Sequence, residues 1–127
     1  MPAYSQGNGR GVYPGDQVSV IASTDSVVSG FKSQCVALSA PQGRAITSIR
    51  AQVDFNADPG TFEVDLQESD TDVDGDYQTV ALANANSGAS KYSCFIDYQG
   101  PTAKFYRIYA KTVTNTVSPG AIGTLSV

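Results

Sequence analysis

Apolar and polar residues alternate along much of this chain, and this period of two constrains the fold more than any other feature of the sequence. The clearest case is TFEVDLQE, residues 61–68. Its apolar positions are Phe62, Val64 and Leu66, and its polar positions are Glu63, Asp65 and Gln67. Because successive side chains of a β-strand point to opposite faces, the pattern predicts a strand with one buried face and one face in water.

Eight segments of this kind follow one another. They are residues 17–23, 31–40, 45–55, 61–68, 77–82, 91–98, 104–113 and 121–127. The connections between them, such as SAPQGR, NADPG, DVDGD and VSPG, are rich in residues that favour turns. No segment shows the 3.6-residue apolar spacing of a helix. The sequence therefore predicts an all-β fold, an antiparallel β-sandwich of about eight strands with jelly-roll or immunoglobulin-like topology.

The first sixteen residues differ from the rest. They contain four Gly and two Pro and show no periodicity, which predicts a flexible arm over residues 1–16 before a sandwich domain over residues 17–127. Tyr4, Val12 and Tyr13 are its aromatic and β-branched side chains. One interpretation is a disordered tail. The other is an arm that becomes ordered against a partner, with these three residues as contacts.

The charges are unevenly distributed along the chain. The net charge is -4, which argues against nucleic acid as a partner because phosphate binding needs clustered Lys and Arg. Eight acidic residues and no basic residue lie between Asp58 and Asp76. The basic residues of the C-terminal third are Lys91, Lys104, Arg107 and Lys111. A monomer would place both groups on one solvated surface, whereas an assembling protein would set one group against the other on a neighbouring copy.

The sequence also bears on where the chain functions. No stretch of 18 apolar residues is present, so we expect no membrane-spanning helix. The N-terminal segment lacks the apolar core of a signal peptide, and the initiating Met favours use without Sec export over removal of a leader. Reduced thiols are then the default for Cys35 and Cys94, with a disulfide between them as the alternative.

The segment ESDTDVDGDYQTV, residues 68–80, resembles the start of a calcium-binding loop. Its acidic positions are Asp70, Asp72, Asp74 and Asp76. Counted from Asp70, Gly75 fits position six of an EF-hand loop, but Ala81 stands at position twelve, where a carboxylate is needed. The alternative is a solvated hairpin tip that turns at Asp74–Gly75 with positive φ. The hairpin is the simpler interpretation, and a weak Ca²⁺ site is the other.

Enzyme chemistry finds little support in the sequence. The chain has no His, which excludes Ser-His-Asp and Cys-His arrangements. The GNGRG segment, residues 7–11, is not followed by a helix pattern, as a phosphate-binding loop would be. The carboxylates cluster on one predicted hairpin and not on both sides of a cleft. We therefore expect no catalytic residues and no cofactor.

Tyrosines are concentrated near the C-terminus. Tyr92, Tyr98 and Tyr106 share faces with apolar neighbours, so we expect them to pack in the core. Tyr109 falls on the opposite face, beside Arg107 and Lys111. We expect these three residues to form a surface contact.

Two segments carry a resemblance to a known class of protein. FEVDLQESDTDVDGDYQTV, residues 62–80, has a strand with a Gln-x-Ser end, an acidic tip with Gly, and an aromatic residue and a Val on the return. KFYRIYAKTV, residues 104–113, adds a basic-aromatic-Arg strand. Over about half of the chain, residues 62–113, this combination resembles small β-sandwich proteins of tailed-bacteriophage virions, in particular capsid decoration (cement) proteins.

The resemblance implies a non-enzymatic protein that sits on the outside of a capsid lattice, commonly as a trimer, and clamps neighbouring subunits of the major capsid protein. It transfers no site residue, because the shared pattern is structural. We therefore expect a virion structural protein, made in the host cytoplasm. The alternatives are a carbohydrate- or receptor-binding module of a phage tail or head appendage, and an immunoglobulin-like adhesive domain. Exposed aromatics around a cleft would favour the former, and a Cys35–Cys94 disulfide would favour the latter.

Overall fold

The computed structural model describes residues 11–12, 17–22, 25–38, 48–55, 58–84, 93–115 and 121–126, with the backbone alone for residues 11–12, 17–18 and 121–126. Its elements are β1 (Gly11–Val12), β2 (Gln17–Ile21), β3 (Phe31–Lys32), β4 (Val36–Leu38), β5 (Ser48–Phe55), β6 (Phe62–Ser69), the 3₁₀ turn η1 (Asp74–Asp76), β7 (Gln78–Asn84), β8 (Ser93–Gln99), β9 (Phe105–Val113) and β10 (Ala121–Ser126). Every predicted strand is present, and the predicted strand over residues 31–40 is divided into β3 and β4. The described residues include no helix of the length and apolarity that a membrane crossing requires.

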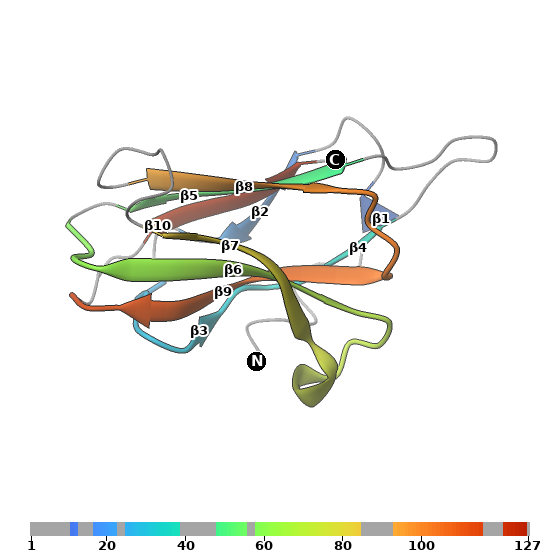
Figure 1. Cartoon of the computed structure of the whole chain (residues 1–127), viewed down its shortest axis with the longest axis horizontal. Coiled ribbons are helices and arrows are strands. Elements are labelled where there is room, and N and C mark those ends of the chain that lie inside the picture. Colours follow the sequence, from blue (N-terminus) through green and yellow to red (C-terminus); the bar gives the residue numbers. More distant parts are fainter. Residues whose placement is uncertain are drawn as a thin grey trace.

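The strands form two sheets that stack as the layers of a sandwich (Figure 1). Sheet A has the order β1-β4-β9-β6-β7, with β3 also pairing with β9, and sheet B has the order β2-β10-β5-β8. All strand pairs are antiparallel except β1 with β4. The predicted all-β sandwich is therefore confirmed.

The pairing also identifies the topology that the sequence left open. Strands near the two ends of the sequence pair with each other, and the pairing continues toward the middle of the sequence. The pairs are β2 with β10, β3 and β4 with β9, β5 with β8, and β6 with β7. The chain thus forms one long hairpin, and the further pairs β5–β10 and β6–β9 wrap that hairpin into two sheets. This nested arrangement is a jelly roll.

The predicted N-terminal arm needs a correction at one place. Gly11 and Val12 form β1, which pairs in parallel with Ala37 and Leu38 at the edge of sheet A. The described part of that arm is therefore a strand of the sandwich. Tyr4 and Tyr13 lie outside the described residues, as does the side chain of Val12.

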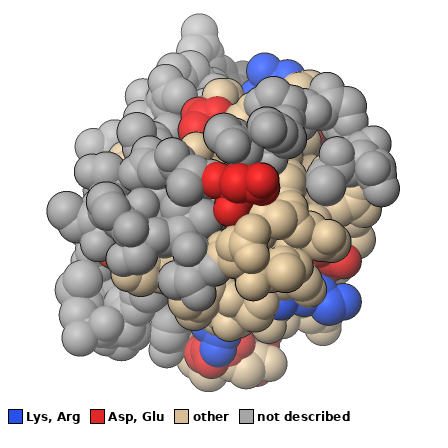
Figure 2. All heavy atoms as spheres, turned by 90° about the vertical axis from the view of Figure 1, so that its left-hand side faces the viewer, with Lys and Arg blue, Asp and Glu red and all other residues tan. Residues whose placement is uncertain are grey.

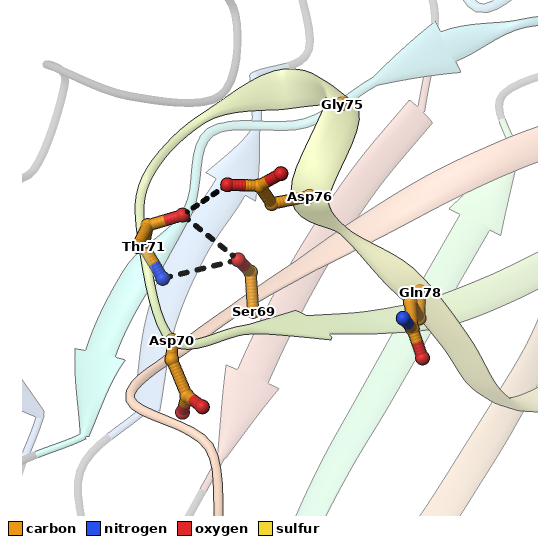
Figure 3. Close-up of a pocket in the computed structure, with 6 residues that line it drawn as sticks. All are labelled: Ser69, Asp70, Thr71, Gly75, Asp76 and Gln78. Carbon is orange, nitrogen blue, oxygen red and sulfur yellow. Dashed lines mark hydrogen bonds between the residues drawn. The ribbon is translucent and has the colours of Figure 1, made fainter.

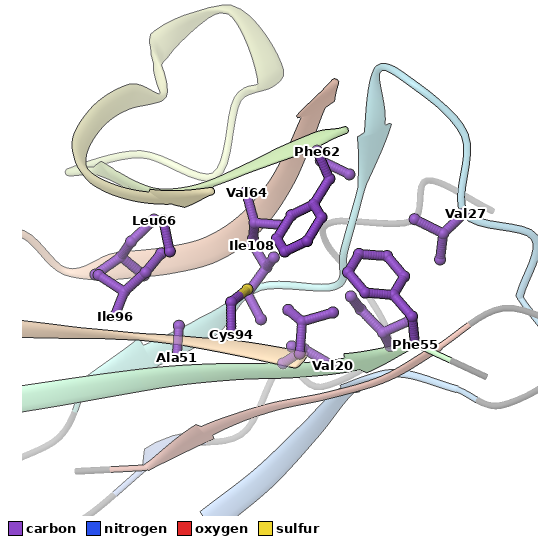
Figure 4. Packing of buried hydrophobic residues seen from close by; sticks show 14 of the residues in the cluster. Val20, Val27, Ala51, Phe55, Phe62, Val64, Leu66, Cys94, Ile96 and Ile108 are labelled. Atoms are coloured by element: carbon purple, nitrogen blue, oxygen red, sulfur yellow. The ribbon is translucent and has the colours of Figure 1, made fainter. Parts of the chain in front are cut away.

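The core lies between the inner faces of the two sheets. In β5 the buried residues are Ile49, Ala51, Val53 and Phe55, and the exposed residues between them are Arg50, Gln52 and Asp54, as the alternation predicts. Figure 4 shows Phe55 of sheet B facing Phe62 of sheet A, with ring centroids 5.2 Å apart. Each large apolar side chain buried in this way contributes roughly 1.5–3 kcal/mol.

Two predicted core tyrosines can be placed. Tyr106 is completely buried, and its hydroxyl donates a 2.8 Å hydrogen bond to Glu68. Tyr98 is half-buried, and its ring centroid lies 6.3 Å from that of Tyr106. Tyr92 lies outside the described residues.

Strand β6 departs from the prediction because both of its faces are covered. Phe62, Val64 and Leu66 point into the core, as predicted. Asp65 and Gln67 lie on the other face, where the sequence predicts contact with water, yet both are buried. Another part of the chain therefore covers the outer face of sheet A at these two residues.

Candidate functional site

The tip of the β6–β7 hairpin, residues 70–77, folds back against the outer face of sheet A. Figure 1 shows turn η1 on the side of sheet A that faces away from sheet B. Asp74 accepts a 2.8 Å hydrogen bond from Lys32 Nζ of β3 and a 2.7 Å hydrogen bond from Arg107 Nη1 of β9. These two contacts hold the tip to the sheet.

The tip turns differently from the prediction. The hairpin is present, but Asp74 and Gly75 belong to a single 3₁₀ turn. Among the described residues, the glycines with positive φ are Gly30, Gly60 and Gly100. The predicted positive φ at Gly75 is therefore wrong, because a 3₁₀ turn uses ordinary negative φ values.

Arg107 is the centre of the contact between tip and sheet. Its side chain is almost fully buried, with 2 % of the residue exposed. Its Nε donates a 2.8 Å hydrogen bond to Gln67 Oε1, and its guanidinium lies 4.0 Å from the centre of the Tyr77 ring. The prediction that Arg107 takes part in a surface contact is wrong, because the chain's own tip covers it.

Further hydrogen bonds extend this contact along the outer face. Gln67 Nε2 donates to Thr79 Oγ1 at 3.4 Å, and Thr79 Oγ1 donates to Asp65 Oδ2 at 2.9 Å. One connected set of side chains thus crosses sheet A, and we call it the outer-face network. Its members are Lys32, Asp74, Arg107, Gln67, Thr79 and Asp65.

The two aspartates of the outer-face network have pKa values shifted in opposite directions. Hydrogen bonds from Lys32 and Arg107 lower the pKa of Asp74. Burial, together with the neighbouring Glu63 carboxyl group, raises the pKa of Asp65 to about 6. The network therefore favours the ionised form of one carboxyl group and the neutral form of the other.

Tyr77 connects the tip to the start of β4. Its hydroxyl donates a 3.0 Å hydrogen bond to Asp72, and burial and a hydrogen bond with Cys35 raise the tyrosine pKa. Burial raises the pKa of Cys35 to about 11 and that of Cys94 to about 12. Neither cysteine forms a disulfide, which agrees with the default expectation and removes the feature that would favour an immunoglobulin-like adhesive domain.

The four aspartates of the proposed calcium loop lie in different surroundings. Asp74 binds Lys32 and Arg107, while Asp72 accepts from Tyr77 and Asp76 accepts a 2.7 Å hydrogen bond from Thr71 Oγ1. Asp70 is exposed. Within the described ranges, no three acidic, Cys or His side chains are grouped so that they could hold a metal ion. The described geometry therefore gives the Ca²⁺ interpretation no ligand set.

A polar hollow of about 370 Å³ lies beside the tip. Its lining residues are Ser69, Asp70, Thr71, Gly75, Asp76 and Gln78. In Figure 3 the side chains of Ser69, Thr71 and Asp76 point toward one another. Thr71 Oγ1 donates a hydrogen bond to Asp76 Oδ2 and shares another with Ser69 Oγ. Among the residues that the structure describes, this lining offers carboxylate, hydroxyl and amide groups and no aromatic ring.

The outer face of sheet B carries a different kind of site. Phe95 of β8 is 44 % exposed, and the Arg50 guanidinium of β5 lies 4.4 Å from the centre of its ring. Two hydrogen bonds, of 2.9 and 3.3 Å, tie Arg50 to the Asp97 carboxylate. We call these three residues the sheet B patch. Sequence reasoning missed it, although Phe95 is a large aromatic residue at an outward position of the alternating strand.

The predicted interaction residues on β9 lie on sheet A. Tyr109 is half-buried and Lys111 is exposed, with Lys111 Nζ 3.8 Å from Glu63 Oε2. Together with the Arg107–Asp74 pair, this contact sets the basic residues of the C-terminal third against the acidic segment within one chain. On the face in Figure 2, acidic and basic side chains lie interspersed among the described residues. These contacts fit the monomer interpretation of the uneven charge.

Comparison with known proteins adds no family to this picture. No protein-family model matches the chain, and no curated protein sequence matches it. Function is therefore inferred from the sheet B patch, the outer-face network and the polar hollow.

Proposed function

We propose that the chain is a non-enzymatic virion structural protein that binds the outer capsid surface and stabilises the capsid lattice, as decoration (cement) proteins do. The observation that carries the proposal is the sheet B patch, an exposed aromatic ring and an arginine on the outer face of a sheet. Aromatic residues and Arg are enriched at protein–protein interfaces and dominate their binding energy. Small-molecule sites, in contrast, are concave and mostly apolar.

The geometry of the patch supports a contact role in a second way. Asp97 holds Arg50 over the Phe95 ring through a two-point ion pair. Docking then costs less side-chain entropy, because the arginine is already ordered before a partner arrives. The cost of removing such an anchor is typically about 1–4 kcal/mol of binding free energy.

The partner in this proposal is the major capsid protein, and the chain acts on the capsid exterior after synthesis in the host cytoplasm. A homotrimer is the favoured assembly. Jelly rolls occur in viral capsid proteins and in lectins, so the topology alone favours either class of function. The sheet B patch has the aromatic and arginine composition of a protein–protein interface, and it therefore favours binding to a capsid protein over binding to a sugar.

A co-sedimentation experiment tests the proposal. Capsids that lack the chain are mixed with the purified wild-type chain, with Phe95→Ala and with Leu82→Ala. Leu82 is the matched control, because it is 50 % exposed but belongs to β7 of sheet A. We expect the wild-type chain and Leu82→Ala to sediment with capsids, and Phe95→Ala to bind roughly 30-fold more weakly. A wild-type chain that stays in the supernatant would exclude capsid decoration, and equal loss in both variants would exclude the patch.

The polar hollow supports a second candidate, a carbohydrate-binding module. Carboxylates and hydroxyls of Asp70, Asp76 and Thr71 line the hollow, and such groups accept hydrogen bonds from sugar hydroxyls. Retention of the wild-type chain on a glycan array, lost in Asp76→Asn, would favour this candidate. The capsid proposal predicts no retention.

A further inference from the structure

Asp65 contains a buried oxygen atom that has no hydrogen-bond partner. The residue is 2 % exposed, although it lies on the outer face of sheet A. Its Oδ2 accepts the hydrogen bond from Thr79, but its Oδ1 accepts none. An ionised carboxylate in such a place is unfavourable, because both of its oxygens need donors when water is excluded.

The groups that face Asp65 come from three strands. Glu63 lies two residues away on the same face of β6. Tyr109 of β9 and Leu82 of β7 lie beside Asp65 in the pairing register, and Thr79 of β7 supplies the hydroxyl donor. Lys111 of β9 is the cationic group nearby, and its Nζ lies 3.8 Å from Glu63 Oε2. Lys111 therefore pairs with Glu63, while the neighbour of Asp65 on this face is the Glu63 carboxyl group.

We propose that Glu63 and Asp65 form a proton-binding site, in which the two carboxyl groups hold one proton between them. A proton taken from water binds a carboxylate oxygen of Asp65 and makes it an O–H donor to the Glu63 carboxylate. The buried oxygen thereby gains its missing partner. One negative charge remains on the pair and faces Lys111, so the site is electrically balanced while the proton is bound.

The electrostatics of the site agree with this assignment. Burial is the largest cause that raises the pKa of Asp65 to about 6, and the neighbouring Glu63 carboxyl group is the next. Thr79 and Lys111 act in the opposite direction and favour the ionised form, with smaller effects than burial. The proton is therefore bound in mildly acidic solution and released near neutral pH.

Release of the proton has a structural consequence. Asp65 is the terminal member of the outer-face network that reaches Arg107 and the hairpin tip through Thr79 and Gln67. When the proton leaves, two carboxylates repel each other beside the β6–β7 pair. We expect the hairpin to exchange its amide hydrogens faster above the pKa of Asp65 than below it.

Carbon-13 NMR of the side-chain carboxyl groups tests the proposal on the intact chain. Between about pH 3 and about pH 9, the Asp65 carboxyl carbon should titrate near pH 6, well above the ordinary aspartate value of about 4. Glu63→Gln places an amide donor beside Asp65, so it should move the Asp65 midpoint to lower pH. Asp70→Asn, at an exposed acid of the same hairpin, should leave the midpoint in place. An ordinary midpoint in the wild-type chain, or no movement in Glu63→Gln, would overturn the proposal.

Stability gives an independent readout with a definite sign. The folded-state pKa of Asp65 is above its unfolded value, so the folded state binds the proton more tightly. The stabilisation is complete below about pH 4 and is lost as the pH rises through about 6. Relative to Asp65→Asn, the wild-type folding equilibrium constant should therefore fall by roughly fiftyfold between about pH 4 and about pH 7.

A metal ion is the competing occupant of a carboxyl pair. Millimolar Ca²⁺ or Mg²⁺ should leave the Asp65 carbon resonance unchanged at about pH 5, because the proton already occupies the site. A shift on addition of either ion would assign the site to a metal and overturn the proton assignment. A parallel pH dependence of stability in the wild-type chain and in Asp65→Asn would overturn it as well.

Discussion

Replacing Arg107 with alanine removes the side chain that holds the hairpin tip on sheet A. Gln67, which is buried, loses the donor to its Oε1 atom, at a cost of about 1–3 kcal/mol. Tyr77 loses the cation above its ring, which is worth about 0.5–2 kcal/mol. Asp74 loses one of two partners, but it is 40 % exposed and keeps Lys32, so that loss is smaller. The sum predicts a decrease of about 3 kcal/mol in the free energy of unfolding.

Urea denaturation measures this change, because urea does not screen charges. Arg107→Lys is the informative second variant. Lysine keeps the positive charge, but its single amine cannot replace the two guanidinium nitrogens that bind Gln67 and Asp74. It should lose roughly half as much as the alanine variant. Hydrogen exchange should show the loss as faster exchange in residues 70–77, with little change in β5.

Arg50 provides the matched control within the same chain. It also pairs with an aspartate and lies over an aromatic ring, but its side chain and that of Asp97 are about half exposed. Arg50→Ala should therefore cost less than about 1 kcal/mol. Equal losses for Arg50→Ala and Arg107→Ala, or a loss below about 1 kcal/mol for Arg107→Ala, would refute the reasoning that burial gives the Arg107 contacts their strength.

Two further predictions concern glycine and cysteine. Gly60→Ala should destabilise the fold by about 1–2 kcal/mol, because φ at Gly60 is +69° and an added Cβ would lie 3.0 Å from Asn115 Nδ2. Gly75→Ala is the control, since no atom lies within 4 Å of the added Cβ, and it should leave the thermal unfolding temperature nearly unchanged. Cys35 and Cys94 should react slowly with a thiol reagent at about pH 8 in the folded chain, because both are buried with pKa values raised to about 11 and about 12. Under denaturing, non-reducing conditions two thiols should react per chain, and a count of none would show a disulfide.

Alternation predicted the strands well because it is a local property of the chain. Each strand shows which residues share a face, and β5 follows the predicted pattern of burial at every position from Ile49 to Phe55. The pairing order was not predictable in this way. It depends on which strands meet across long sequence distances, and a jelly roll and an immunoglobulin-like sandwich can be built from similar alternating strands.

The same locality explains the errors on the outer face of sheet A. The sequence placed Asp65, Gln67 and Arg107 on the correct side of their strands. It did not reveal that the tip would fold over that side, because the contacts that hold it join Asp74 to residues 42 and 33 positions away. A clue existed in the composition: the acidic tip contains carboxylates without local basic partners, while Lys32 and Arg107 project from neighbouring strands.

The two outer faces of the sandwich consequently differ in what they offer a partner. On sheet A, the tip already occupies Arg107 and one carboxylate of the acidic segment, so a partner would have to break the contacts of Asp74 before it could use them. On sheet B, Arg50 and Asp97 satisfy each other while leaving Phe95 exposed, so a partner can cover the ring without separating the ion pair. Desolvating an intact pair costs less than leaving one charge unpaired. A protein that contacts a capsid through this fold is therefore expected to dock with sheet B and to leave the hairpin tip of sheet A facing water.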